Sequence, residues 1–173
     1  EALGLIRQAL PPEVALIGFC GAPFTLANYL IEGGGSDDHA ETKRMLRERP
    51  ALVHALLGRL AAAMGEYLAG QVRAGAQVVQ IFESSGGALG PDEYEEFALP
   101  YARRAIEGAK AAGAPAIFFP RGCGGYLERL ADCGADAMGV DWQTGLAEAN
   151  RRLGGRFVLQ GNLDPSALLG SPE

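Results

Sequence analysis

Cysteine and histidine are scarce in this sequence of 173 residues. The three cysteines, Cys20, Cys123 and Cys133, are an odd number and include no CxxC pair, which argues against a disulfide framework or a zinc knuckle. A reducing compartment fits this usage, and we predict a cytoplasmic protein. The two histidines, His39 and His54, fall in stretches predicted to be helical, away from strand ends. Serine or cysteine hydrolase chemistry therefore lacks a base.

The sequence also lacks a long uncharged apolar run and an excess of basic residues. The longest apolar stretch, residues 51–74, is interrupted by His54, Arg59, Glu66 and Arg73, so we expect no membrane span. The formal net charge is −6, and the 15 lysines and arginines are scattered along the chain. This distribution argues against a nucleic-acid-binding surface.

What the sequence does contain is a regular alternation of helical and strand patterns. The hydrophobic content of 48% and the chain length fit one globular domain. A small-Gly-small signal recurs between a helical stretch and an apolar run, at residues 74–76, 112–114 and 133–135. Such a signal is typical of the short turns that join helices to the strands of a parallel sheet.

Five strands are predicted, separated by helices. A barrel of the (β/α)₈ type is favoured over an open doubly wound sheet, because successive strands start close together and no Gly-x-Gly-x-x-Gly follows a strand. A closed barrel needs eight strands. We therefore expect about five βα units of a longer single domain, ending at residues 171–173 before the last strands. The strands are predicted at residues 14–20, 78–82, 116–119, 137–140 and 157–160.

Helices are predicted between these strands. A loop with a helix is expected at residues 122–133. The glycine-rich segment 33–38 is not followed by the Lys-Ser/Thr of a phosphate-binding loop, and we interpret it as a flexible connection or lid. Pro100 should divide one helix in two. The helices are expected at residues 1–10, from Pro23 to about residue 32, and at 39–49, 51–74, 92–99, 101–112 and 146–153.

Polar residues follow the predicted strands at their carboxyl ends. The strand at 78–82 reads as buried on both faces, and Glu83, Ser84 and Ser85 come directly after it. In parallel α/β folds these ends open onto ligand, so we expect the polar residues there to share one mouth. Simpler roles stay open, namely turn hydroxyls for Ser84 and Ser85, a core position for Tyr29, and backbone-amide acceptors for Glu83 and Asp141. The expected mouth residues are Tyr29, Glu83, Ser84, Arg121, Asp141, Gln160 and Asn162.

Four long segments, in the same order, closely resemble the uroporphyrinogen decarboxylase family. They are residues 16–36, 75–84 with 98–101 behind it, 139–142 and 159–165. The resemblance implies a (β/α)₈ barrel, usually a homodimer, which removes carbon dioxide from the four acetate side chains of uroporphyrinogen III to give coproporphyrinogen III in heme biosynthesis. It implies no metal and no organic cofactor.

The resemblance also implies roles for particular residues. Tyr29 and Ser84 match family residues that contact the substrate, and Phe82 matches an aromatic residue that lines the cleft. The catalytic aspartate and arginines of the family match positions before Glu1, and a family histidine matches a position after Glu173. No catalytic residue is therefore assigned in this sequence, which is expected to be inactive alone.

Two alternatives to this function follow from the same barrel. Related cobalamin-dependent methyltransferases carry zinc on a His-x-Cys pair and a later cysteine, whereas this sequence has Arg121-Gly-Cys123 at that place. Arginine is not a zinc ligand, which weakens this alternative, and Arg121 could instead bind a substrate carboxylate. A barrel that binds a tetrapyrrole without catalysis is the other alternative.

Overall fold

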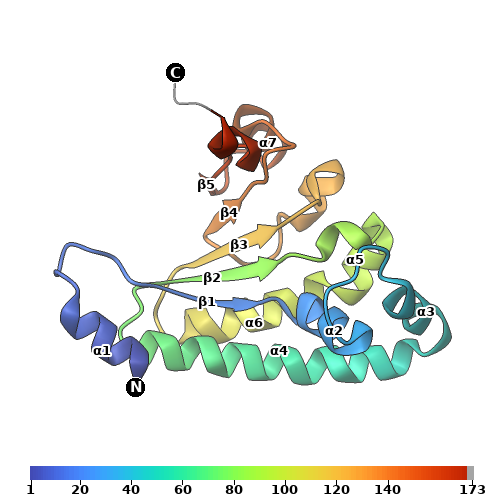
Figure 1. Cartoon of the computed structure of the whole chain (residues 1–173), viewed down its shortest axis with the longest axis horizontal. Coiled ribbons are helices and arrows are strands. Elements are labelled where there is room, and N and C mark those ends of the chain that lie inside the picture. The colour runs from blue at the N-terminus through green and yellow to red at the C-terminus, as the bar shows by residue number, and fades with distance from the viewer. Residues whose placement is uncertain (171–173) are drawn as a thin grey trace.

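The computed structural model describes residues 1–170, and its centre is a sheet of five parallel strands. Their order across the sheet is β1-β2-β3-β4-β5, the same as their order in the chain (Figure 1). In a doubly wound sheet the order in which successive strands are added reverses at one point of the sheet. In a barrel each strand is added next to the previous one, as it is here. The predicted barrel-type fold is confirmed. The strands are β1 (Ile17–Gly21), β2 (Val78–Glu83), β3 (Ala116–Pro120), β4 (Ala137–Gly139) and β5 (Val158–Gln160).

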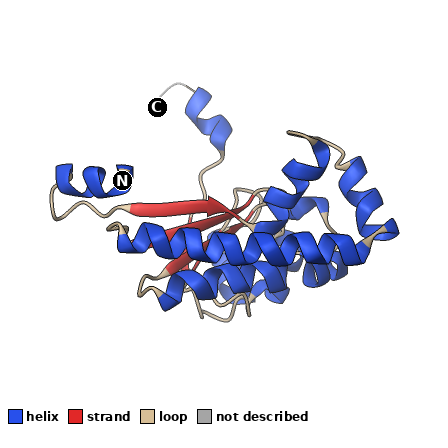
Figure 2. Ribbon diagram, turned by 90° about the horizontal axis from the view of Figure 1, so that it is seen from below, coloured by secondary structure: helices blue, strands red, loops and turns tan. Residues whose placement is uncertain are grey.

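Helices occupy the connections between the strands. The long α4 and the neighbouring α6 run beneath the sheet, whereas α2, α3 and α5 lie toward the carboxyl ends of the strands (Figures 1 and 2). The helices are α1 (Ala2–Ala9), α2 (Pro23–Glu32), α3 (Ala40–Glu48), α4 (Pro50–Arg73), α5 (Pro91–Phe97), α6 (Leu99–Ala111) and α7 (Leu146–Arg152). Residues 1–170 also contain three 3₁₀ segments, η1 (Gly86–Ala88), η2 (Gly124–Leu130) and η3 (Pro165–Leu169). Among the described helices, none combines the length and the apolar character that crossing a membrane requires.

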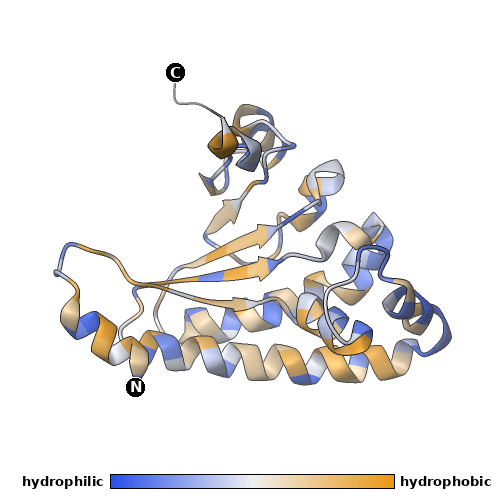
Figure 3. Cartoon of the chain, viewed as in Figure 1, coloured by the Kyte–Doolittle hydropathy of each residue, from blue (hydrophilic) through white to orange (hydrophobic). Residues whose placement is uncertain are grey.

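The core lies between the sheet and the helices below it. Val79, Ile81 and Phe118 point to this side and are fully buried, and the strands are mainly hydrophobic (Figure 3). On the opposite side, the side chain of Phe19 is 62% exposed and that of Phe82 is partly exposed. The expectation that residues 78–82 are buried on both faces is therefore wrong for the described residues, because helices cover only one face of β2 here.

The turns largely follow the sequence pattern. Gly75, Gly113 and Gly134, the central residues of the repeated boundary signal, have φ of +108°, +94° and +84°, a region that glycine enters without steric cost. The break between α5 and α6 falls at Ala98, and Pro100 lies in the first turn of α6 instead of at the break. Proline is well tolerated there, since the first turn has no intrahelical partner for its missing N–H. Residues 171–173, where we expected the sequence to stop short of the last strands, lie outside the described residues.

Candidate functional site

A cavity of about 620 Å³ lies at the carboxyl ends of the strands. Its walls come from α2, the glycine-rich loop after it, the start of α3, and the loops that follow β2, β3 and β4. Of the expected mouth residues, Tyr29, Ser84, Arg121 and Asp141 line it together. The side chain of Tyr29 is 47% exposed and Ser84 is also exposed, so both hydroxyls are accessible.

A second hollow of about 330 Å³ adjoins the first on the open face of the sheet. Phe82, Gln160 and Asn162 line this hollow, and Asp141 and Trp142 belong to both. The rings of Phe82 and its neighbours on β1 and β3 meet edge to face, with centroids about 6 Å apart. Phe82 therefore presents an apolar surface beside the polar cavity that holds Tyr29 and Ser84.

Thr25 connects the two elements that carry Tyr29 and Ser84. It lies on α2, one helical turn before Tyr29, and its hydroxyl donates to Oε1 of Glu83. The same hydroxyl accepts from the backbone N–H of Ser85 at 3.1 Å. The position of Ser84 relative to Tyr29 is thus fixed by buried hydrogen bonds, which hold more rigidly than bonds exposed to water.

Asn28 forms a second connection and brings a histidine to the cavity. Its Oδ1 accepts from the hydroxyl of Thr42 at 2.9 Å and from Nδ1 of His39 at 3.0 Å, while its Nδ2 lies 3.4 Å from Oγ of Ser85. His39 was expected within a helix away from the strand ends, and this is wrong. It immediately precedes α3 and lines the cavity, because the glycine-rich loop turns the chain back toward the strands.

Glu83 was expected in the mouth, but its side chain is fully buried and does not line the cavity. Burial raises the pKa of its carboxyl to about 8, which its hydrogen bonds with Thr25 only partly oppose. Its Oε2 has no hydrogen-bond partner among the described residues, and the same holds for the buried hydroxyl of Tyr94. Glu83 is therefore placed to position its neighbours and not to contact a ligand in this cavity.

Asp141 lies on the cavity wall, yet both of its oxygens are occupied. Oδ2 accepts from the backbone N–H of Gly122 at 2.7 Å, and Oδ1 accepts from that of Gln143 at 3.1 Å. Of the two roles left open for this residue, the structure shows the backbone-amide acceptor. Asp141 thereby holds the loop after β3, including Arg121, against the loop after β4.

Cys123 lies behind the cavity and not in its wall. Its side chain is fully buried, the hydroxyl of Tyr126 lies 3.3 Å from its Sγ, and burial raises the pKa of the thiol to about 12. Among the described residues, no three His, Cys, Asp or Glu side chains are grouped closely enough to hold a metal ion.

Five sequential βα units with a polar cavity at the strand ends define a protein of the (β/α)₈-barrel class. A solved methyltransferase from Methanosarcina mazei shares this fold, with a TM-score of 0.79 and 21% sequence identity over 94% of this chain and 47% of the other. The family model for uroporphyrinogen decarboxylase (URO-D) matches residues 1–173, and the chain belongs to this family.

Curated relatives agree with the family match. The uroporphyrinogen decarboxylase of Pseudomonas fluorescens (strain SBW25) is 47% identical over 177 residues, and that of Cupriavidus necator (strain H16) is 50% identical over 181 residues. Each alignment covers 100% of this chain and 50% of the relative. The chain thus spans about half the length of these relatives.

Proposed function

We propose that the complete protein containing this chain is a uroporphyrinogen decarboxylase. It would convert uroporphyrinogen III to coproporphyrinogen III by removing carbon dioxide from the four acetate side chains, in heme biosynthesis. The observation that carries this proposal is the family match over residues 1–173. The shared cavity of Tyr29 and Ser84 supports it, because the resemblance assigns both residues to substrate contact.

The chemistry requires little beyond a preorganised pocket. Once a pyrrole ring is protonated, the bond between the acetate methylene and its carboxylate can break, and its electron pair neutralises the ring cation as carbon dioxide leaves. Protonation of the resulting exocyclic methylene and loss of the added ring proton give a methyl group. The ring itself is the electron sink, so we propose that no cofactor takes part, and the protein needs only to stabilise a cation in a partly desolvated site.

In this proposal the chain supplies substrate contacts, and the catalytic aspartate and arginines come from outside it. The hydroxyls of Tyr29 and Ser84 hydrogen-bond the macrocycle from two connected elements. Phe82 contacts its apolar edge from the adjoining hollow. The test is anaerobic incubation of the complete protein with uroporphyrinogen III, followed by chromatography of the products. Stepwise loss of carboxyl groups to coproporphyrinogen III is expected, and an unchanged substrate would contradict the proposal.

Removing either hydroxyl should weaken catalysis without unfolding the protein. Tyr29→Phe and Ser84→Ala each delete one hydrogen-bonding group at an accessible position, so we expect kcat/KM to fall by roughly 10-fold. The thermal midpoint should stay within about 2 °C of the wild type, since neither hydroxyl supports the core. Steady-state kinetics and thermal unfolding measure the two effects.

A matched control is Tyr67→Phe. Tyr67 is an exposed tyrosine on α4 that lines neither hollow, so the same atom is removed away from the site. Its kinetics should equal those of the wild type. If Tyr29→Phe and Ser84→Ala also leave kcat/KM unchanged, the two residues do not contact the substrate.

We also propose that the complete protein is a cytoplasmic homodimer. The three buried free thiols fit a reducing compartment, and the dimer follows from the resemblance. Sedimentation equilibrium of the purified protein tests the dimer.

A further inference from the structure

One wall of the cavity gathers side chains that can carry positive charge. His39 precedes α3, Lys43 lies four residues later and Arg121 follows β3, and all three line the same cavity as Tyr29 and Ser84. The group formed by His39, Lys43 and Arg121 is called the basic wall below.

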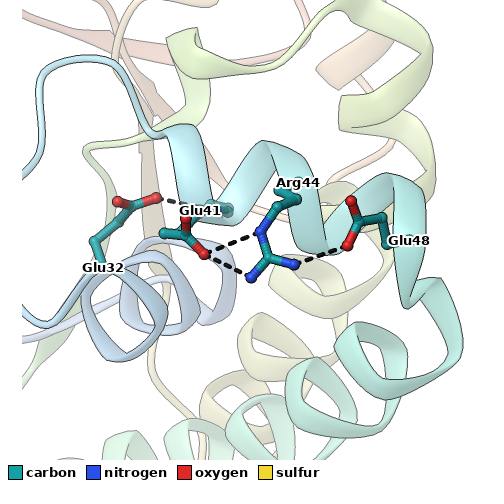
Figure 4. Close-up of polar contacts among 5 residues, drawn as sticks. Glu32, Glu41, Arg44 and Glu48 are labelled. Carbon is teal, nitrogen blue, oxygen red and sulfur yellow. Dashed lines mark hydrogen bonds and ion pairs between the residues drawn. The ribbon is translucent and has the colours of Figure 1, made fainter.

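Arg44 on the exposed side of α3 is paired with carboxylates of the same helix, whereas the basic wall has no such pairs within residues 1–170. Arg44 lies between Glu41 and Glu48, 2.7 Å from an oxygen of each, and forms a closed surface network (Figure 4). Lys43 instead donates to the backbone carbonyl of Asp38 at 2.9 Å. The hydrogen bond from Ser36 and, to a smaller extent, the charge of Lys43 lower the pKa of the Asp38 carboxyl, but Lys43 does not form an ion pair with it. The guanidinium of Arg121 lies 5.8 Å from the centroid of the Trp142 ring. Within residues 1–170, neither Lys43 nor Arg121 forms an ion pair.

Acidic side chains near the wall are mostly engaged elsewhere. Both oxygens of Asp141 accept backbone N–H groups. Oδ1 of Asp38 accepts from Ser36 and from the backbone of Ala40. Asp37 is the other acid that lines the cavity, so two carboxylates stand against two cations, Lys43 and Arg121, and one histidine. The wall therefore keeps positive charge available to a ligand.

His39 is held by two hydrogen bonds that leave one of its ring nitrogens without a partner among the described residues. Its backbone has φ of +53°, an uncommon value for a residue with a side chain, and uncommon backbone of this kind clusters at functional sites. Its N–H donates to Oγ of Ser36 at 3.1 Å, and Nδ1 donates to Oδ1 of Asn28. Because Nδ1 is used, Nε2 is the ring nitrogen left to a ligand, and it has no hydrogen-bond partner within residues 1–170.

We infer that the basic wall binds carboxylate side chains of the macrocycle. The inference deepens the proposed function and rests on it for the identity of the ligand. Uroporphyrinogen carries a carboxylate on every peripheral side chain, and guanidinium binds carboxylate in bidentate fashion while ammonium acts as a point charge. Tyr29 and Ser84 would contact the macrocycle while the wall holds its periphery.

Binding of uroporphyrin, the stable oxidised macrocycle with the same carboxylates, tests the inference without turnover. In the complete protein, Lys43→Gln and Arg121→Gln should each raise the dissociation constant for uroporphyrin by roughly 10-fold. The affinity of these variants should depend less steeply on salt concentration than that of the wild type. His39→Asn should weaken it by roughly 3-fold, and asparagine tolerates the positive φ. The matched control is Arg47→Gln on the same helix, an exposed arginine outside the cavity, which should stay within 2-fold of the wild type. Fluorescence titration measures all four.

The outcomes separate this inference from the proposed function. If the wild type decarboxylates uroporphyrinogen but the three wall variants bind uroporphyrin as well as Arg47→Gln does, the basic wall is overturned and the function stands. If uroporphyrin binding depends on the basic wall but the wild type releases no carbon dioxide from uroporphyrinogen, the proposed function is wrong and the inference about the basic wall is supported. If the wild type does not bind uroporphyrin, the inference that the basic wall binds carboxylates is wrong.

Discussion

Gly108→Ala is expected to destabilise the complete protein by about 3 kcal/mol, although alanine is the better helix former. Gly108 lies on α6 where that helix meets α4, and a Cβ at this position would stand 2.7 Å from Cα of Gly65 and 3.0 Å from its carbonyl carbon. The contact is backbone on backbone, so no side chain can rotate away. The two helices would have to separate, which loosens their packing beneath the sheet. Urea unfolding measures the change.

Gly58 and Gly65, which lie on α4, serve as controls for Gly108 on α6. At Gly58 no atom lies within 4 Å of the added Cβ, so Gly58→Ala should stabilise the protein by about 0.5–1 kcal/mol through helix propensity alone. At Gly65 the nearest atom, Cα of Gly108, would be 3.5 Å away, which is an ordinary contact, so Gly65→Ala should be nearly neutral. If Gly108→Ala proves as stabilising as Gly58→Ala, the helices do not approach as closely as described.

Much of this fold was predictable because its signals are local. The strands are short apolar runs, and Gly75 and Gly113 mark turns that need positive φ. The expected mouth was largely right for the same reason, since the ends of parallel strands meet at one edge of the sheet. Ser84 lies in the shared cavity because it directly follows β2, and Tyr29 lies there because α2 begins just after β1.

Glu83 could have been placed correctly from the same sequence. Side chains alternate between the two faces of a strand. Glu83 lies two residues after Ile81 and four after Val79, so it is on the same face of β2 as these two residues, which face the helices. His39 was different, because the path of the glycine-rich loop is set by tertiary contacts such as that with Asn28. No periodicity in residues 33–39 encodes that path.

Glu83→Gln is expected to remove the loss of stability that the buried Glu83 carboxyl should cause between pH 5 and pH 8. The native carboxyl has a pKa of about 8, raised from 4.5 by burial. Between these values the unfolded chain releases this proton and the native state keeps it, so the native state binds more protons and stability falls as pH rises. Above pH 8 the loss is complete. The difference between the pKa of about 8 in the native protein and the value of 4.5 corresponds to a destabilisation of up to about 5 kcal/mol.

Glutamine cannot ionise, and its carbonyl oxygen can still accept from Thr25. We therefore expect Glu83→Gln to resemble the wild type near pH 5 and to be more stable by several kcal/mol near pH 8, in urea unfolding of the complete protein at each pH. Glu66→Gln, the same change at an exposed position on α4, is the control. If Glu83→Gln and the wild type lose stability in parallel across this range, the buried carboxyl ionises without penalty. The unpartnered Oε2 would then have to be solvated in the native protein.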